Sequence, residues 1–339
     1  MHLTEASSLH GTLKTFLKNK KAERNRKDYL RDTAEERLKG KNMILGVDNG
    51  NFETKSSGRI CYKSGCKQIS SDTEADSTIF CNGKLYSVGE TRSAMMLNKT
   101  LSENMWIQTL PAIAEAIEAA GEARNNVIQL GIGVPLKHFR DMKAVYIEYF
   151  KDRSCSFVYK GKKYTVLITD VKCYPQGFAV YLHHYSDLSQ YKECVVIDIG
   201  GGTMDVFKVV SGKPVTASFR SFSSGVIHLI NDIAETLSNA GINVSEDMIC
   251  EAVSMGSVNH RRKDEINDVC AEKTKEYTRE LIGQLKENGY DLELPCILIG
   301  GGTSLLCPYL KASDELYVVQ TYDNFANAEA YAWLMESGR

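Results

Sequence analysis

Three glycine-rich junctions, each at the end of a short apolar run, are the segments of this sequence with the clearest chemical potential. They span residues 46–51 (GVDNGN), 197–203 (IDIGGGT) and 298–303 (LIGGGT). Because glycine has no Cβ, the backbone N–H groups around it can come close to an anion. Two such junctions that face each other could hold a polyphosphate from both sides, and the third could lie against a nucleoside. The spacing matches neither a Walker A loop nor a Rossmann dinucleotide loop.

Asp48 and Asp198 occupy matching positions in the first two junctions, where the apolar runs end. Two carboxylates beside a phosphate site repel each other unless a cation lies between them. Mg²⁺ keeps several of its waters in proteins, so both side chains could act largely through water. Each carboxylate could instead cap a turn, but the matched spacing favours the metal role. Asp205 either supports the same hydration shell or faces solvent, and the sequence does not decide between the two.

Apolar runs and helical periodicities alternate along the chain and predict the elements that must position these junctions. The predicted strands are residues 43–48, 127–134, 194–199 and 296–299, with a hairpin over 157–172. The predicted helices are residues 104–120, 178–184, 224–237, 264–288 and 326–335. Pro111 would either kink the first of these helices or mark its true first turn. Strands that alternate with helices indicate an α/β fold with mixed sheets.

The composition excludes several classes of protein. The 339 residues are 43% hydrophobic and 25% charged with a net charge of −2, so the chain is not disordered as a whole and has no global basic field for nucleic acid. No apolar run approaches the roughly 18 residues that a membrane helix needs, and no secretory segment is visible. The ten cysteines form no CxxC pair. We therefore expect a cytoplasmic protein with reduced, mostly packed thiols and no membrane contact.

Residues 1–42 differ from the rest of the chain. They contain eleven Lys/Arg and six Asp/Glu, a surplus of five positive charges, and few apolar residues between Lys18 and Arg31. Such a segment has little surface to bury in a core, which favours a loosely ordered basic extension, or translated sequence upstream of a start at Met43. The alternative is a basic arm that contacts a partner.

The junctions resemble the nucleotide motifs of the ATPase superfamily that contains actin, heat-shock chaperones and sugar kinases. Residues 48–55 (DNGNFETK) resemble its first phosphate loop, 198–205 (DIGGGTMD) its second, and 300–303 (GGGT) its adenosine motif. The likeness extends in order over roughly residues 43–335. Within the superfamily the chain is most similar to the ParM-like bacterial actins of plasmid segregation, with support from residues 169–176, 223–226, 260–264 and 322–334.

This resemblance implies a fold and a set of site residues. The expected fold is the actin-like ATPase fold, in which two ribonuclease-H-like domains, here residues 43–184 and 185–339, enclose a nucleotide cleft. Asp48, Asp198 and Gln176 are the implied catalytic residues, and Lys55 takes the place of the lysine that meets the phosphates. The implied cofactor-binding residues are Gly50, Asn51, Lys55, Gly200, Gly201, Gly202, Thr203, Gly300, Gly301, Gly302 and Thr303.

The resemblance also implies a role. ParM-like proteins bind ATP with Mg²⁺, polymerise into filaments and hydrolyse the ATP, which makes the filaments unstable; GTP is a possible substitute. A DNA-binding adaptor on a centromere-like plasmid site couples the filament to DNA. An adaptor that makes the DNA contact agrees with the net charge of −2, which gives this chain no basic field for DNA. We therefore expect self-assembly into filaments and an adaptor partner. We expect no direct sequence-specific DNA binding.

Gln176 departs from the ParM pattern. It follows Pro175 at the position where ParM has a glutamate and actin a glutamine. A glutamine is no strong base, but its amide can orient a water for in-line attack, and phosphoryl transfer needs mainly positioning and charge stabilisation. The alternative is a polar turn residue after proline.

Two other functions within the superfamily remain open. A small-molecule kinase needs a general base beside its acceptor hydroxyl, and we find no further carboxylate motif to supply one. A non-polymerising chaperone or reactivase is the other alternative. A heat-shock chaperone carries a substrate domain after its ATPase core, and an end at Arg339 leaves little room for one.

Overall fold

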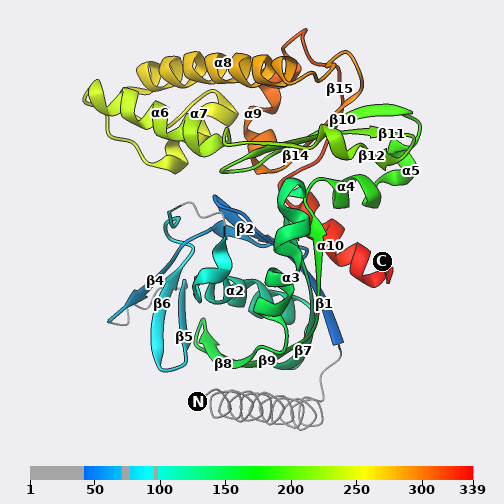
Figure 1. Ribbon diagram of the computed structural model, residues 1–339. Helices are drawn as coiled ribbons and strands as arrows, with labels where there is room; N and C mark the ends of the chain where they lie inside the picture. Colours follow the sequence, from blue (N-terminus) through cyan, green and yellow to red (C-terminus); the bar gives the residue numbers. More distant parts are fainter. Residues whose placement is uncertain (1–41, 71–76, 95–97, 339) are drawn as a thin grey trace, which may run out of the picture.

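Two β-sheets with helices on both sides form the body of the molecule (Figure 1). The computed structural model describes residues 42–70, 77–94 and 98–338. Apart from Asn42, the predicted basic extension over residues 1–42 lies outside the described residues, and the expectations about it stay predictions. No helix in the described ranges is both long and apolar enough to cross a membrane.

The first sheet has nine strands, and its centre is parallel. Strand β1 pairs with β7, and β7 with β9, all in the same direction, so the carboxyl ends of these strands meet at one edge. From edge to edge the order is β3 (Cys61–Lys63), β2 (Glu53–Ser56), β1 (Asn42–Asn49), β7 (Asn125–Val134), β9 (Lys162–Pro175), β8 (Ser154–Tyr159), β5 (Thr78–Cys81), β6 (Lys84–Val88) and β4 (Cys66–Ile69).

The second sheet has six strands with a parallel core of β10, β14 and β15. Its order is β12 (Lys213–Pro214), β11 (Met204–Val210), β10 (Glu193–Ile199), β14 (Cys296–Ile299) and β15 (Val318–Thr321), and β13 (Arg220–Phe222) pairs with β11. Both faces of β10 are covered: Val195 and Ile197 belong to one apolar cluster and Val196 to another. This double burial explains why β10 is a continuous apolar run without alternation.

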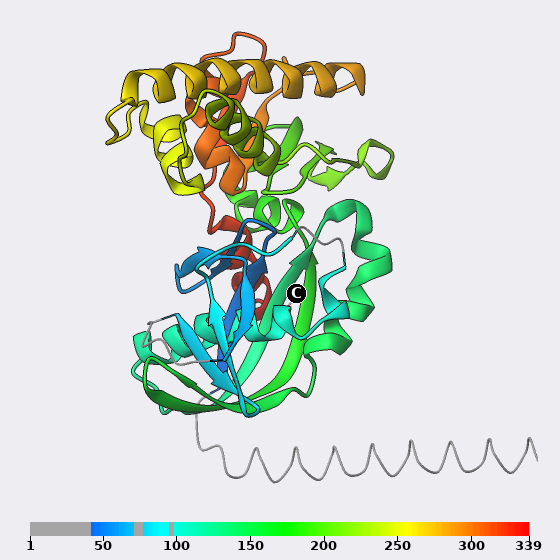
Figure 2. The same ribbon diagram turned by 90° about the vertical axis from the view of Figure 1, so that its left-hand side faces the viewer.

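The helices divide the structure into layers. Helices α2 (Asn104–Ala119) and α3 (Phe139–Phe150) share one core with the first sheet. Four helices share a second core with the outer face of the second sheet, and the yellow and orange ones gather above that sheet in Figure 2. They are α6 (Val226–Asn239), α7 (Glu246–Met255), α8 (Lys263–Glu287) and α9 (Gly301–Lys311).

A third core lies between the two sheets. It is built from α4 (Phe178–His183), α5 (Tyr185–Leu188) and α10 (Ala326–Glu336), together with the inner face of the second sheet. Figure 1 shows α4 and α10 in this central position. Helix α10 comes from the C-terminal part of the chain but packs on β1 and β7 of the first sheet. The boundary between residues 184 and 185 stays a prediction.

The strands and helices expected from the sequence are present with small shifts at their ends, including the hairpin of β8 and β9. Pro111 lies inside α2 rather than in its first turn, because the helix already begins at Asn104. The third glycine junction leads directly from β14 into a helix, because Gly301 is the first residue of α9.

Gly46 allows α10 to lie directly on the sheet. A Cβ at Gly46 would come 1.9 Å from the carbonyl oxygen of Ala328 on α10. Its ladder partner on β7, Gly131, lies under Tyr331 of the same helix. The sheet therefore presents bare backbone to α10 at this point, and any side chain there would push the helix away.

We expect Gly46→Ala to lower the free energy of unfolding by about 1–3 kcal/mol, because the new methyl group forces α10 off β1. Urea denaturation followed by circular dichroism measures the loss. Gly283→Ala is the matched control: Gly283 lies within α8, nothing surrounds its Cβ position, and alanine should stabilise that helix by roughly 0.5–1 kcal/mol. Equal stability of the two variants would contradict this account of the packing.

Candidate functional site

An open cavity lies between the two sheets, where the ends of β1 and β10 approach each other. The first and second glycine junctions both contribute to its wall, as do Gln176 and the carboxylates of Asp48, Asp198 and Asp205. The sequence-predicted residues that line it are Asp48, Gly50, Asn51, Lys55, Gln176, Asp198, Gly200, Gly201, Gly202, Thr203, Asp205, Gly300 and Gly301. Segments from distant parts of the chain therefore meet at one place.

Each of the first two junctions is a hairpin. Strands β1 and β2 are antiparallel, and Asp48 stands opposite Lys55 in their ladder. Strands β10 and β11 are also antiparallel, and Asp198 stands opposite Asp205. The two hairpins thus have the same construction but a different charge balance: one pairs a carboxylate with a lysine and the other pairs two carboxylates.

The two hairpins touch each other across the cavity. A Cβ at Gly201 would come 2.5 Å from Cβ and 2.8 Å from the backbone nitrogen of Phe52, so only glycine fits between them. The second hairpin is also fixed from behind, because the N–H groups of Val226 and Ile227 at the start of α6 donate to the carbonyls of Gly200 and Gly201. A ligand in the cavity therefore meets both backbone loops.

The carboxylates of the second hairpin are poorly compensated. Asp198 is 7% exposed, and burial, helped by the nearby Asp205 and Asp48, raises its pKa to about 7. Asn327 on α10 opposes that rise by donating a 2.9 Å hydrogen bond to Asp198 Oδ2. Burial also raises the pKa of Asp205, and Asp205 Oδ1 has no hydrogen-bond partner among the described residues. A cation would relieve this excess of buried negative charge.

The oxygen donors around the cavity suit a magnesium ion, which prefers carboxylate oxygens and water. Among the residues that the structure describes, no three His, Cys, Asp or Glu side chains converge to hold a metal directly. Asp48 and Asp198 would therefore contact a phosphate-bound ion mainly through its waters, with the unpartnered oxygen of Asp205 behind them. The metal itself stays a prediction.

Gln176 lies at the end of β9, on the wall of the same cavity. Its Nε2 donates a 3.0 Å hydrogen bond to Asp48 Oδ1, and its backbone N–H donates to the carbonyl of Val134. The next residue, Gly177, donates its N–H to Asn327 Oδ1 at 2.9 Å. The amide of Gln176 is thus held against Asp48 of the first hairpin, on the wall of the cavity, where it can orient a small ligand such as water.

A second open cavity adjoins the first and shares Phe52, Lys55, Gly201 and Gly301 with it. Gly302 lines this second cavity, as do Glu251 and Ser254 from α7. Thr303 lines neither cavity. Its side chain is buried and donates a hydrogen bond to the carbonyl of Ile299, so it stabilises the start of α9 instead of facing a ligand.

Two residues of the site were missed by the sequence analysis. Lys99 lines the main cavity, but it belongs to no motif and precedes α2 in a segment without clear periodicity. Asn327 is a buried polar residue in the alanine-rich helix α10. An asparagine among buried alanines was the one available signal, because buried amides need partners.

Two family models match this sequence, one after the other along the chain. The N-terminal domain of actin-like proteins matches residues 46–178, and the C-terminal domain of the archaeal MreB-like actin homologues matches residues 196–312. Together they span well over half of the chain. The chain has the fold of the actin-like proteins. This agrees with the family resemblance inferred from the three glycine junctions.

Solved structures of other actin-like proteins have the same fold. An archaeal actin homologue in complex with ADP is 21% identical, with a TM-score of 0.67 over 87% of this chain and 99% of that one. A ParM filament from Clostridium botulinum is 18% identical, with a TM-score of 0.68 over 87% and 99%. ParM of Bacillus thuringiensis with ATP is 14% identical, with a TM-score of 0.64 over 88% and 100%. Among curated proteins, no sequence matches this chain.

These structures confirm the prediction of an actin-like α/β fold for this protein. At such low identity they establish the fold alone. The roles of the individual site residues remain predictions, whereas the contact between the two hairpins can be tested by the following substitution.

We expect Gly201→Ala to lower the thermal midpoint of the ligand-free protein by several degrees, since an added Cβ overlaps Phe52 and overpacking costs about 1–3 kcal/mol. Differential scanning calorimetry measures the shift. Gly200→Ala is the control, because the nearest atom to its Cβ position, the carbonyl oxygen of Thr203, lies 3.4 Å away. If both substitutions lower the midpoint equally, the contact between the hairpins is not what constrains residue 201.

Proposed function

We propose that this actin-like protein binds ATP together with Mg²⁺, hydrolyses the ATP and assembles into filaments. The observation that carries the proposal is the contact of two glycine hairpins across a cavity lined by Lys55, Gln176 and three carboxylates. The relatives support it: one solved archaeal homologue holds ADP, one ParM holds ATP, and another ParM forms a filament.

The charges in the main cavity suit a polyphosphate. Lys55 is 6% exposed, and its ammonium lies 3.3 Å from the position of a Cβ on Gly301, at the start of α9. The backbone N–H groups at the start of a helix favour anions, and α9 begins here without a capping side chain. Mg²⁺, when bound, would offset the charge that develops on the phosphates, with Asp48 and Asp198 holding its waters.

The adjoining cavity is where the nucleoside would lie. Its wall combines the apolar Phe52 and Leu305 with the polar Glu251 and Ser254. Apolar contacts on the base and hydrogen bonds to the ribose need such a mixture. We therefore assign the base and ribose to this cavity, and we keep both ATP and GTP as nucleotides to test.

We further propose that the filaments segregate plasmid DNA in the cytoplasm and that a separate DNA-binding adaptor links the filament to a centromere-like site. The similarity to ParM proteins supports this role. The net charge of −2 supports the adaptor, because a protein without a basic field gains little from direct phosphate contacts.

We expect Mg-ATP to induce polymers that scatter light, appear as filaments in electron micrographs and release phosphate. Self-association through repeated head-to-tail contacts produces such open polymers. Mg-GTP and Mg-ADP are the comparison nucleotides. Transfer of phosphate to an added metabolite without polymer would favour a kinase instead, and client-dependent turnover without polymer would favour a reactivase.

We expect Gln176→Ala to slow phosphate release by roughly tenfold to a hundredfold, because water is no longer oriented for in-line attack. ATP binding should stay unchanged, since the amide of Gln176 contacts Asp48 and the phosphate loops remain in place. Single-turnover phosphate release and a nucleotide-binding titration measure the two effects. Gln190→Ala, at an exposed position after α5, is the control. Unchanged turnover in Gln176→Ala would remove this residue from the mechanism.

A further inference from the structure

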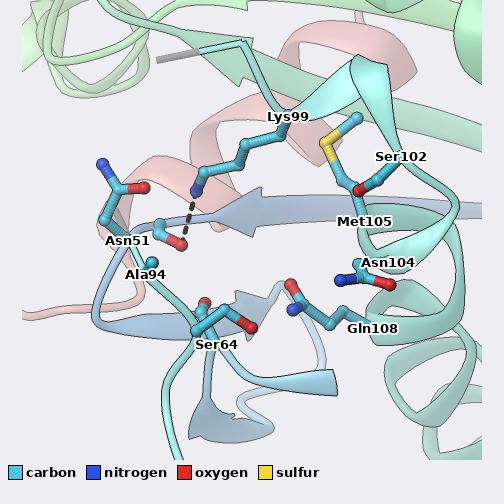
Figure 3. A pocket seen from close by; sticks show the side chains of 10 residues that line it. Asn51, Ser64, Ala94, Lys99, Ser102, Asn104, Met105 and Gln108 are labelled. Atoms are coloured by element: carbon cyan, nitrogen blue, oxygen red, sulfur yellow. Dashed lines mark hydrogen bonds between the residues drawn. The ribbon is translucent and has the colours of Figure 1, made fainter. Parts of the chain in front are cut away.

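Lys99 is a second cation in the wall of the candidate nucleotide cavity, in addition to Lys55. It is the first residue of a single 3₁₀ turn, Lys99–Leu101. The preceding Asn98 fixes that turn, because its Oδ1 accepts hydrogen bonds from both the N–H and the hydroxyl of Thr100. The backbone of Lys99 therefore has a defined position from which its side chain reaches the first hairpin (Figure 3).

The ammonium of Lys99 contacts the backbone at the turn of the first hairpin. It donates hydrogen bonds to the carbonyl oxygens of Asn49 and Gly50, the second at 2.6 Å. Lys99 also lines a small cavity together with Ser64 and Gln108. The side chain thus borders two cavities and holds the backbone of the hairpin turn, which borders both as well.

This contact determines which way the peptide groups of the hairpin face. In a trans peptide the carbonyl and the following N–H point in opposite directions. When the carbonyls of Asn49 and Gly50 point to Lys99, the N–H groups of Gly50 and Asn51 point away from it. Neither N–H donates a hydrogen bond to another described residue. Both donors are thus available to an anion.

The charge of Lys99 is less compensated than that of Lys55. Lys55 has Glu53 at 3.3 Å and Asp48 opposite it in the ladder, whereas the ammonium of Lys99 contacts carbonyl oxygens rather than a carboxylate among the described residues. Burial lowers the pKa of Lys99 to about 8, and Asp48 opposes this effect. A cation held by carbonyls alone gains more from an incoming anion than one already paired.

We propose that Lys99 is the positioning residue of the first phosphate hairpin: it holds the carbonyls of Asn49 and Gly50, directs the N–H groups of Gly50 and Asn51 to the phosphates, and adds positive charge to the cavity. This inference rests on the proposed nucleotide binding. It assigns Lys99 a role toward the phosphate chain and none toward the nucleoside, which lies in the adjoining cavity.

Binding of ATP and of adenosine, which lacks phosphates, tests this assignment by calorimetry. Lys99→Met should weaken ATP binding by about tenfold or more, the loss expected for hydrogen bonds to a charged group, and leave adenosine binding unchanged. Lys99→Arg keeps the charge and should retain most of the ATP affinity. Lys84→Met, at an exposed position on β6, is the control that should bind ATP like the wild type. Lys99→Gln replaces Lys99→Met if the latter does not fold.

The outcomes separate this inference from the proposed function. If the wild type binds ATP and Lys99→Met binds it equally well, the role of Lys99 is overturned while nucleotide binding stands. An equal loss of ATP and adenosine binding would also overturn it, because such a loss indicates a general structural defect. A wild type that does not bind ATP overturns both proposals.

Discussion

The close approach of neighbouring elements at glycine positions, where no side chain keeps them apart, is the constraint on which the rest of this structure depends. Gly201 lets the second hairpin lie against Phe52 of the first, and Gly46 lets α10 lie against β1. A side chain at either position would separate elements that now touch. Since van der Waals contact falls off steeply with distance, such contacts hold the edges of the two sheets in one geometry. The candidate site is a consequence of that geometry, because its residues come from both sheets.

Electrostatics give the site a preference for two ligands at once. The second hairpin places Asp198 directly opposite Asp205, an arrangement of like charges that costs stability in an antiparallel pair and favours a cation. The first hairpin has Lys55 opposite Asp48 and Lys99 behind its turn, which favours an anion. The proposed magnesium ion and polyphosphate would together satisfy both sides better than either ion alone, because each would offset the charge that the other leaves.

Asn327 connects the site to the layer between the sheets. It lies on α10, donates to Asp198 on the second sheet, and accepts from the N–H of Gly177 at the end of the first sheet's strand β9. Gln176, one residue earlier, donates to Asp48. The region around residues 176–177 therefore contacts both halves of the candidate site. A change in the distance between the sheets would alter the hydrogen bond from Asn327 to Asp198, because α10 packs on the first sheet and Asp198 lies in the second.

Local sequence patterns predicted many of the elements and several residues that line the cavity, whereas α3, α7 and α9 were not predicted. The apolar run of β10 and the carboxylates Asp48 and Asp198 could be recognised because strand burial and glycine junctions leave short-range signals. Three features depended on the tertiary structure: the contact of Lys99 with the first hairpin, the bridge made by Asn327, and the turning of Thr303 away from the cavities. Each of the first two is a contact between residues far apart in the chain, and the third follows from the start of α9. No local pattern specifies which distant backbone or carboxylate a side chain will meet, because only packing of the two sheets brings them together.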